Sequence, residues 1–275
     1  MPRAEFGSTR VESNGARLAY KRNGSGPPVL LIAPAGSRAT IWYRYQVPAL
    51  VGAGYQVVTY DQRGMPPTTG SGEPCDVATL SADAAVLIET LDLRGCRVVG
   101  ASLGALVAQE LAATRPELVA TLALLGTRGA PDAFRTALAR GQAEDLRHGP
   151  GGRLFPAVMS LPLLFAPGSL TDATFVEEWL MGLRHLAPQG EGPAAQFEAT
   201  ADYGGLKDPS AVVCPTLVVS FAHDVIMPPD GGADVAAAVR HGVHHVIADR
   251  GHFGFVEPPD LVSPLLIGFF AGGAR

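Results

Sequence analysis

The sequence has little cysteine, and its cysteines and histidines show no regular spacing. Three cysteines in 275 residues cannot all pair, and Cys96 and Cys214 stand at the starts of expected buried strands. We therefore interpret them as packed thiols rather than as a disulfide framework. No spacing typical of a metal site is present, so we expect neither a metal nor another cofactor.

The sequence also lacks long runs of charge of one sign and long hydrophobic runs. The 21 basic and 26 acidic residues give a formal net charge of −5 without a long run of either sign, so nothing indicates a nucleic acid partner. No apolar segment approaches the ~20 residues that span a bilayer, and the N-terminus lacks a hydrophobic signal core. We expect a cytoplasmic protein, a monomer or homodimer, that acts on a small molecule away from membranes.

Short apolar runs alternate with segments of helical period. Hydrophobic residues make up 47% of the chain, which is enough for a substantial core. The apolar runs are too short for amphipathic helices and predict buried strands at residues 28–32, 56–60, 97–101, 121–125, 216–220 and 244–248. The helical segments lie near residues 78–92, 103–114, 231–240 and 260–270. This alternation predicts an α/β fold with a mostly parallel, doubly wound sheet.

Two segments depart from the alternation. Asn14-Gly15 suits the tight turn of a hairpin between residues 6–12 and 16–22, which predicts an antiparallel edge. After about residue 128, prolines and aromatic residues predict several short helices instead of further strands. We interpret residues 128–207 as a helical cap inserted in a core domain that is formed by residues 1–127 and 208–275.

The expected cap holds more large apolar side chains than short helices need for burial among themselves. We assign Phe155, Phe165 and Trp179 to substrate binding, on the expectation that some of these side chains line an apolar chamber. The alternative is that all of them pack the cap onto the sheet. The same apolar group includes Leu163, Leu164, Phe175, Met181 and Leu183.

A serine stands between two glycines where an expected strand meets an expected helix. In Gly100-Ala101-Ser102-Leu103-Gly104, the glycines would let strand and helix approach closely around a sharp turn, as in a nucleophile elbow. The alternative is an ordinary tight turn in which the serine is merely small. We predict that Ser102 is a nucleophile and that the backbone N–H of Leu103, at the helix start, faces an oxyanion.

A serine hydroxyl needs a base, and the base needs an orienting acid. His252 follows the exit of the last expected strand, whereas residues 244–245, both histidines, stand at its entrance. Asp224 follows the strand at 216–220 and so lies at the same edge of the sheet. Asp208 precedes that strand and fits a structural cap. The predicted catalytic residues are Ser102, Asp224 and His252.

These residues and their order resemble the α/β-hydrolase superfamily of the serine-nucleophile type. The resemblance covers nearly the whole chain and rests on Gly100–Gly104, on the strand at 215–219 that leads to Asp224, and on Gly251-His252-Phe253. It implies the α/β-hydrolase fold and a Ser-Asp-His triad. A serine at position 102 excludes the aspartate-nucleophile epoxide hydrolases and haloalkane dehalogenases.

Two loops depart from the pattern of that superfamily. Members often have His-Gly after the first central strand, where this chain has Ala33-Pro34-Ala35-Gly36-Ser37. Pro34 has no N–H, so we expect the second oxyanion donor at Ala35. The loop from Asp61 to Thr68 carries two prolines where members commonly have Asp-x-Arg-Gly-x-Gly-x-Ser. We interpret Arg63 as a structural partner of Asp61, with contact to a substrate carbonyl as the alternative.

The resemblance implies a serine hydrolase that cleaves a small or medium apolar carboxylic ester through an acyl-enzyme. The glycine- and alanine-rich composition and the proline-containing loop are also similar to actinobacterial members from natural-product pathways. Some of those members eliminate acetate from an acetylated intermediate, so a lyase with the same triad is the first alternative. A non-catalytic receptor for a small ligand on this fold is the second.

Overall fold

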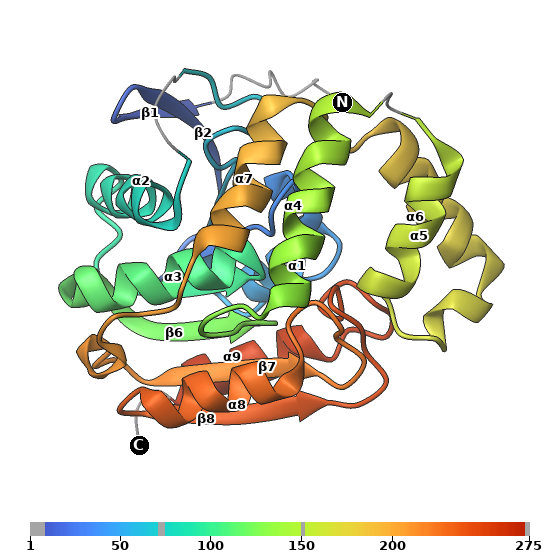
Figure 1. Ribbon diagram of the computed structural model, residues 1–275. Coiled ribbons are helices and arrows are strands. Elements are labelled where there is room, and N and C mark those ends of the chain that lie inside the picture. The colour runs from blue at the N-terminus through green and yellow to red at the C-terminus, as the bar shows by residue number, and fades with distance from the viewer. Residues whose placement is uncertain (1–8, 71–74, 150–151, 273–275) are drawn as a thin grey trace, which may run out of the picture.

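A computed structural model of the protein describes residues 9–70, 75–149 and 152–272 (Figure 1). Its centre is an eight-stranded sheet in the order β1-β2-β4-β3-β5-β6-β7-β8. The hairpin of β1 (Thr9–Ser13) and β2 (Ala16–Asn23) forms an antiparallel edge. The other six strands are parallel: β3 (Pro28–Ile32), β4 (Gln56–Tyr60), β5 (Cys96–Ala101), β6 (Val119–Leu125), β7 (Thr216–Phe221) and β8 (Gly242–Ile247). Residues 6–8 of the expected first strand lie outside the described residues.

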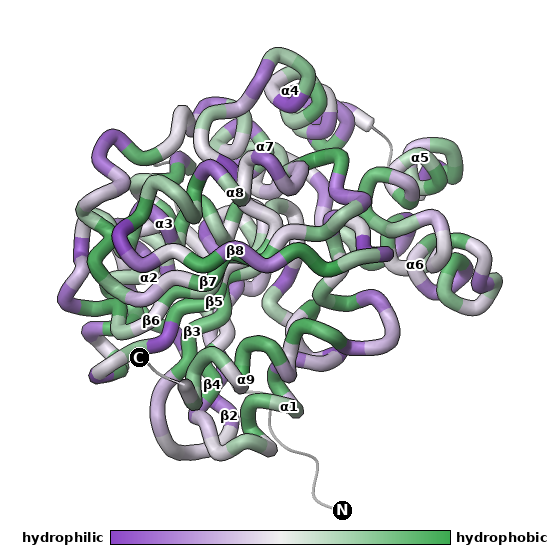
Figure 2. Tube along the Cα trace, turned by 90° about the horizontal axis from the view of Figure 1, so that it is seen from below, coloured by the Kyte–Doolittle hydropathy of each residue, from purple (hydrophilic) through white to green (hydrophobic). Residues whose placement is uncertain are grey.

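Alternate side chains of the central strands face two separate hydrophobic cores. In β3, Leu30 and Ile32 point to one core, and Val29 and Leu31 point to the other, as the period of two in a strand requires. The first core is covered by α2 (Val77–Thr90), α3 (Leu103–Thr114) and α8 (Pro229–Ala238). The second is covered by α1 (Gln46–Gly52) and α9 (Val262–Gly272). Figure 2 shows these two groups of helices on opposite sides of the largely hydrophobic strands.

Helix α1 is an element that the sequence pattern does not predict. It is seven residues long and contains Pro48 in its first turn, a position that tolerates proline but leaves too little chain to show a helical period. Tertiary contacts stabilise it instead. Val47 and Leu50 are buried, and the buried Gln46 side chain donates a hydrogen bond to the Phe255 carbonyl at 2.8 Å.

In the described residues between β6 and β7, four α-helices lie in the segment where short helices are expected. They are α4 (Ala133–His148), α5 (Leu154–Leu164), α6 (Ala173–His185) and α7 (Glu191–Asp202). Helices α4 and α7 pack side by side, and α5 and α6 form a second pair (Figure 1). The predicted fold class, including an inserted helical segment, is confirmed, while the domain boundaries stay a prediction. None of the helices in the described ranges is long and apolar enough to cross a membrane.

Candidate active site

Ser102 lies at a sharp turn between β5 and α3. Its backbone has φ +54° and ψ −120°, a conformation that costs a residue with a side chain about 1–3 kcal/mol. The flanking glycines allow this turn. A Cβ on Gly100 would lie 2.1 Å from the Gly104 carbonyl oxygen, and a Cβ on Gly104 would lie 2.1 Å from the Ile32 carbonyl oxygen. Both glycines are therefore required by the close approach of strand and helix.

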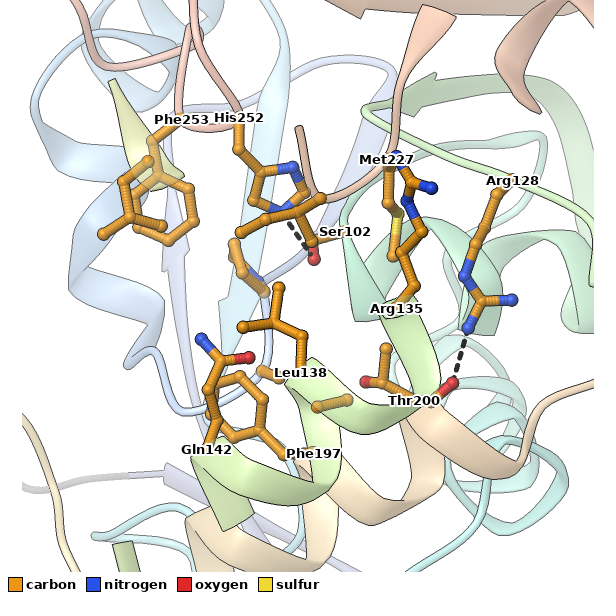
Figure 3. Close-up of a pocket in the computed structure, with 15 residues that line it drawn as sticks. Ser102, Arg128, Arg135, Leu138, Gln142, Phe197, Thr200, Met227, His252 and Phe253 are labelled. Atoms are coloured by element: carbon orange, nitrogen blue, oxygen red, sulfur yellow. Dashed lines mark hydrogen bonds between the residues drawn. The ribbon is translucent and has the colours of Figure 1, made fainter. Parts of the chain in front are cut away.

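The structure brings Ser102, His252 and Asp224 together in one hydrogen-bonded chain. His252 Nε2 lies 2.9 Å from Ser102 Oγ (Figure 3), and His252 Nδ1 lies 2.7 Å from Asp224 Oδ2. The three residues are 8% exposed or less. Asp224 Oδ1 accepts hydrogen bonds from the backbone N–H groups of Ile226 and Met227 at 2.9 and 2.7 Å. The carboxylate is thus fixed on both sides, and the arrangement can move a proton from Ser102 to His252.

The alternative candidates for the acid and the base lie elsewhere in the structure. Asp208 caps a short turn, where its Oδ1 accepts a hydrogen bond from the Ser210 N–H at 3.0 Å. His244 lies on the edge strand β8, with Nε2 2.9 Å from the Ser220 hydroxyl. Neither Asp208 nor His244 is among the described residues that line the pocket at Ser102. In the described ranges, no three His, Cys, Asp or Glu side chains gather as they would around a metal ion.

A buried carboxylate holds the loop that carries His252. Glu257 is fully buried, and its Oε1 accepts a hydrogen bond from the Gly251 N–H at 2.6 Å. Its Oε2 accepts from the Ala166 N–H at 3.1 Å and from the Ser169 hydroxyl. Glu257 therefore joins the histidine loop to the segment after α5. A single glutamate in a loop gives no sequence signal of such a role, and sequence reasoning missed it.

The two predicted oxyanion donors belong to residues close to Ser102, Leu103 next to it in the chain and Ala35 in the lining of the same pocket. Leu103 is the first residue of α3, where the backbone N–H groups have no acceptor inside the helix. Ala35 lies in the loop after β3 and lines the same pocket as Ser102 and Pro34. Because Pro34 has no N–H, the Ala35 N–H remains our predicted second donor. Together the two groups would stabilise negative charge next to the serine.

Gln196 on α7 anchors the loop that carries Ala35. Its side chain is fully buried, its Oε1 accepts a hydrogen bond from the Gly36 N–H at 2.9 Å, and its Nε2 donates to the Arg63 carbonyl at 2.7 Å. Gly36 has φ +64°, and a Cβ on it would lie 2.9 Å from the ring of Phe197. An inserted helix thus fixes this loop, which lacks the histidine common in the superfamily.

We expect Gln196→Leu to lower kcat for ester hydrolysis about 10-fold or more, with a smaller effect on KM. The variant leaves the part-buried Gly36 N–H and the buried Arg63 carbonyl without their partner, so the loop that carries the predicted donor Ala35 loses its anchor. Steady-state kinetics on a short 4-nitrophenyl ester would measure both constants. Gln46→Leu, which removes a buried glutamine hydrogen bond on α1, is the matched control. Equal losses of thermal stability with unchanged kcat in both variants would reduce Gln196 to a structural role.

Arg63 forms a buried ion pair, but its partner differs from the predicted one. The guanidinium binds Asp83 on α2 with distances of 2.9 and 3.0 Å and donates to the Ser13 carbonyl at 3.2 Å. Asp61, the predicted partner, accepts instead from the Ala39 N–H at 2.8 Å. The predicted pairing is wrong because a contact between a loop and the neighbouring helix is not visible along the chain. The alternative contact to a substrate carbonyl has no support from this geometry.

A pocket lies at Ser102. Its volume is about 540 Å³ when the space open to solvent is included. Helix α7 lines it with Phe197 and Thr200. Helix α4 lines it with Arg135, Leu138, Ala139 and Gln142. The spacing i, i+3, i+4, i+7 places these four residues on one helix face. Sequence reasoning missed this face because α4 consists mostly of polar and small residues, although the spacing itself was a usable signal.

The aromatic residues assigned to substrate binding do not belong to the lining of this pocket. Phe155 on α5 is 73% exposed. The buried ring of Phe165 packs against Phe175 and Trp179, with centroid distances of 4.9 and 4.6 Å. None of the three assigned residues is among the described residues that line the pocket, whereas Leu164 of the same apolar group is. Phe165 and Trp179 thus fit the alternative, in which such residues pack the cap onto the sheet, whereas the exposed Phe155 fits neither expectation.

Comparisons with known proteins agree with this architecture. The family model for the alpha/beta hydrolase fold matches residues 27–259. The protein named "Putative non-heme bromoperoxidase BpoC" from Mycobacterium tuberculosis is 38% identical over 259 residues, which cover 92% of this chain and 97% of that protein. Its crystal structure matches with a TM-score of 0.85 at 36% identity, over 94% of this chain and 97% of that one. A thermophilic esterase from Thermogutta terrifontis matches with a TM-score of 0.83 at 26% identity, over 98% and 100% of the two chains. The chain therefore belongs to the α/β hydrolase fold family.

Proposed function

We propose that the protein is a serine hydrolase that cleaves a small or medium, largely apolar carboxylic ester through an acyl-enzyme. The observation that carries this proposal is the hydrogen-bonded chain from Ser102 through His252 to Asp224. Ser102, at one end of this chain, lines a pocket with apolar walls, among them Leu138, Phe197 and Met227. Apolar walls next to the nucleophile suit a largely apolar ester.

The chemistry follows from the positions of these groups. His252 takes the proton of Ser102 as Oγ attacks the ester carbonyl carbon, and the N–H groups of Leu103 and Ala35 stabilise the oxyanion. When the tetrahedral intermediate collapses, the C–O bond to the alcohol breaks and the alcohol takes the proton from His252. Water then loses a proton to His252 and attacks the acyl group on Ser102. The carboxylic acid leaves, and the serine recovers its proton.

The names of the two relatives describe different activities. The Thermogutta terrifontis protein is named an esterase, and the name of the Mycobacterium tuberculosis protein describes a bromoperoxidase. We favour ester hydrolysis because the hydrogen bonds of Ser102 and His252 support a nucleophile with its base, which acyl transfer requires together with oxyanion donors. Ligand binding alone needs no proton path from Ser102 to His252, so the hydrogen-bonded chain favours an enzyme over a receptor.

Turnover of 2-phenylethyl acetate in water enriched with heavy oxygen would test hydrolysis against acetate elimination. A lyase on this fold would use the same three side chains, so the products must separate the two reactions. We expect the heavy oxygen in the released acetate, because water attacks the acyl-enzyme, and an intact, unlabelled 2-phenylethanol. Mass spectrometry of both products would measure this. Unlabelled acetate together with styrene would instead establish direct elimination and contradict the proposal.

A further inference from the structure

The pocket at Ser102 contains two arginines and, among the described residues that line it, no acidic side chain. Arg128 follows β6, and Arg135 lies in the first turn of α4. Figure 3 shows both on the side of the pocket away from Phe253. A neutral ester needs no cation in its binding pocket, so this concentration of positive charge requires an explanation of its own.

Arg128 is a buried cation to which no carboxylate of the described residues binds. It is 5% exposed and donates to the carbonyl oxygens of Gly129, Thr200 and Tyr203 at 2.5, 2.5 and 3.1 Å. The carbonyls of Thr200 and Tyr203 lie at the C-terminal end of α7, where partial negative charge stabilises a cation in part. In the described part of the chain, Arg128 forms no ion pair. Burial lowers its pKa to about 10, which still leaves it charged at neutral pH.

Arg135 is paired on one side of its guanidinium. Nη1 binds Asp132, a half-exposed residue that also caps the N-terminus of α4. Nη2 makes a long contact of 3.4 Å with the Val225 carbonyl. Nε is buried and has no hydrogen-bond partner among the described residues. An unsatisfied buried donor is destabilising, and a ligand oxygen that reached this Nε–H would satisfy it.

From these observations we propose that the substrate carries a carboxylate in addition to its ester, and that Arg128 and Arg135 bind this carboxylate while the ester lies at Ser102. The inference rests on the proposed ester hydrolysis and specifies its substrate class as half-esters of dicarboxylic acids. Carboxylate oxygens accept strong, charge-assisted hydrogen bonds from guanidinium groups. The apolar side chains of Leu138 and Met227 suit the hydrocarbon spacer between the two groups.

Matched pairs of substrates test the proposal directly. The monoethyl esters of glutaric, adipic and pimelic acid carry the carboxylate on spacers of increasing length. Ethyl pentanoate, hexanoate and heptanoate have the same chain lengths without the charge. We expect kcat/KM for at least one half-ester to exceed that of its neutral match about 10-fold or more, because charge-assisted hydrogen bonds are stronger than those between neutral groups. Equal or lower values for all three half-esters would overturn the proposal.

Substitutions test whether the two arginines cause the preference for half-esters. Arg135→Gln and Arg128→Gln should each lower the ratio of half-ester to neutral-ester kcat/KM about 10-fold, whereas Arg128→Lys, which keeps the charge, should retain part of it. Arg140→Gln, an exposed arginine of α4 that pairs with Asp202, is the matched control and should leave the ratio unchanged. An unchanged ratio in Arg135→Gln would overturn the assignment even if Arg128→Gln fails to fold, because Arg135 is partly exposed and caps no helix end.

The proposed function and this inference can fail separately. If neutral esters are hydrolysed as fast as half-esters, the hydrolase remains and the carboxylate site is rejected. If no ester of either kind is hydrolysed and a fluorophosphonate does not label Ser102, the hydrolase itself is rejected and the inference with it.

Discussion

Ser102→Ala is expected to lower kcat for ester hydrolysis about 10⁵- to 10⁶-fold while leaving the fold intact. The substitution removes the oxygen that attacks the ester, and neither His252 nor the oxyanion donors can replace it. The elbow itself is set by the close approach at Gly100 and Gly104, so the backbone around an alanine keeps its course. Kinetics on a short 4-nitrophenyl ester, together with circular dichroism and a thermal unfolding curve, would measure both parts of this prediction.

The chain offers a matched control for Ser102. Ser220 on β7 is also buried, and its hydroxyl lies 2.9 Å from His244 Nε2, the same distance as between Ser102 and His252. Ser220 lies inside a strand instead of at an elbow, so Ser220→Ala should keep its activity and its labelling by a fluorophosphonate. Most of the activity surviving in Ser102→Ala, or an adduct mapped to another serine, would remove Ser102 as the nucleophile.

The parts of the site that sequence reasoning located all follow strands of the parallel sheet. Ser102, Asp224 and His252 come shortly after β5, β7 and β8, and the carboxyl ends of parallel strands meet at one edge. The steric demand of a sharp turn is also local, because it needs glycines two residues before and after the serine. The fold class was predictable for a related reason, since continuous apolar runs mark buried strands.

The parts that sequence reasoning missed depend on packing between distant segments. Gln196 reaches the loop at Gly36 across 160 positions of the chain, and the partner of Arg63 proved to be Asp83 on another element. The inserted helices show the same limit. An aromatic residue such as Phe165 satisfies the sequence pattern equally well in a substrate pocket and in a packing cluster, and only the arrangement of α5 and α6 against the core decides between them.

Asp224→Asn is expected to lower kcat about 10⁴-fold, by analogy with serine proteases. The structure gives this loss a specific cause. Asp224 Oδ1 accepts hydrogen bonds from the N–H groups of Ile226 and Met227, so an asparagine must direct its carbonyl oxygen toward these two donors. Its NH₂ group then faces His252 Nδ1, 2.7 Å from the position of the present carboxylate oxygen.

An NH₂ group in this position can only donate, so His252 Nδ1 would have to accept and the ring proton would move to Nε2. A protonated Nε2 cannot take the proton of Ser102, and the variant would retain the shape of the site without its base. Asp208→Asn is the matched control, because Asp208 caps a turn away from the pocket, and its activity should stay within about 2-fold of the parent. Kinetics would rank the two variants, and nitrogen NMR of the imidazole would show the tautomer directly. A larger loss in Asp208→Asn, or an unchanged tautomer in Asp224→Asn, would mean that another group orients His252.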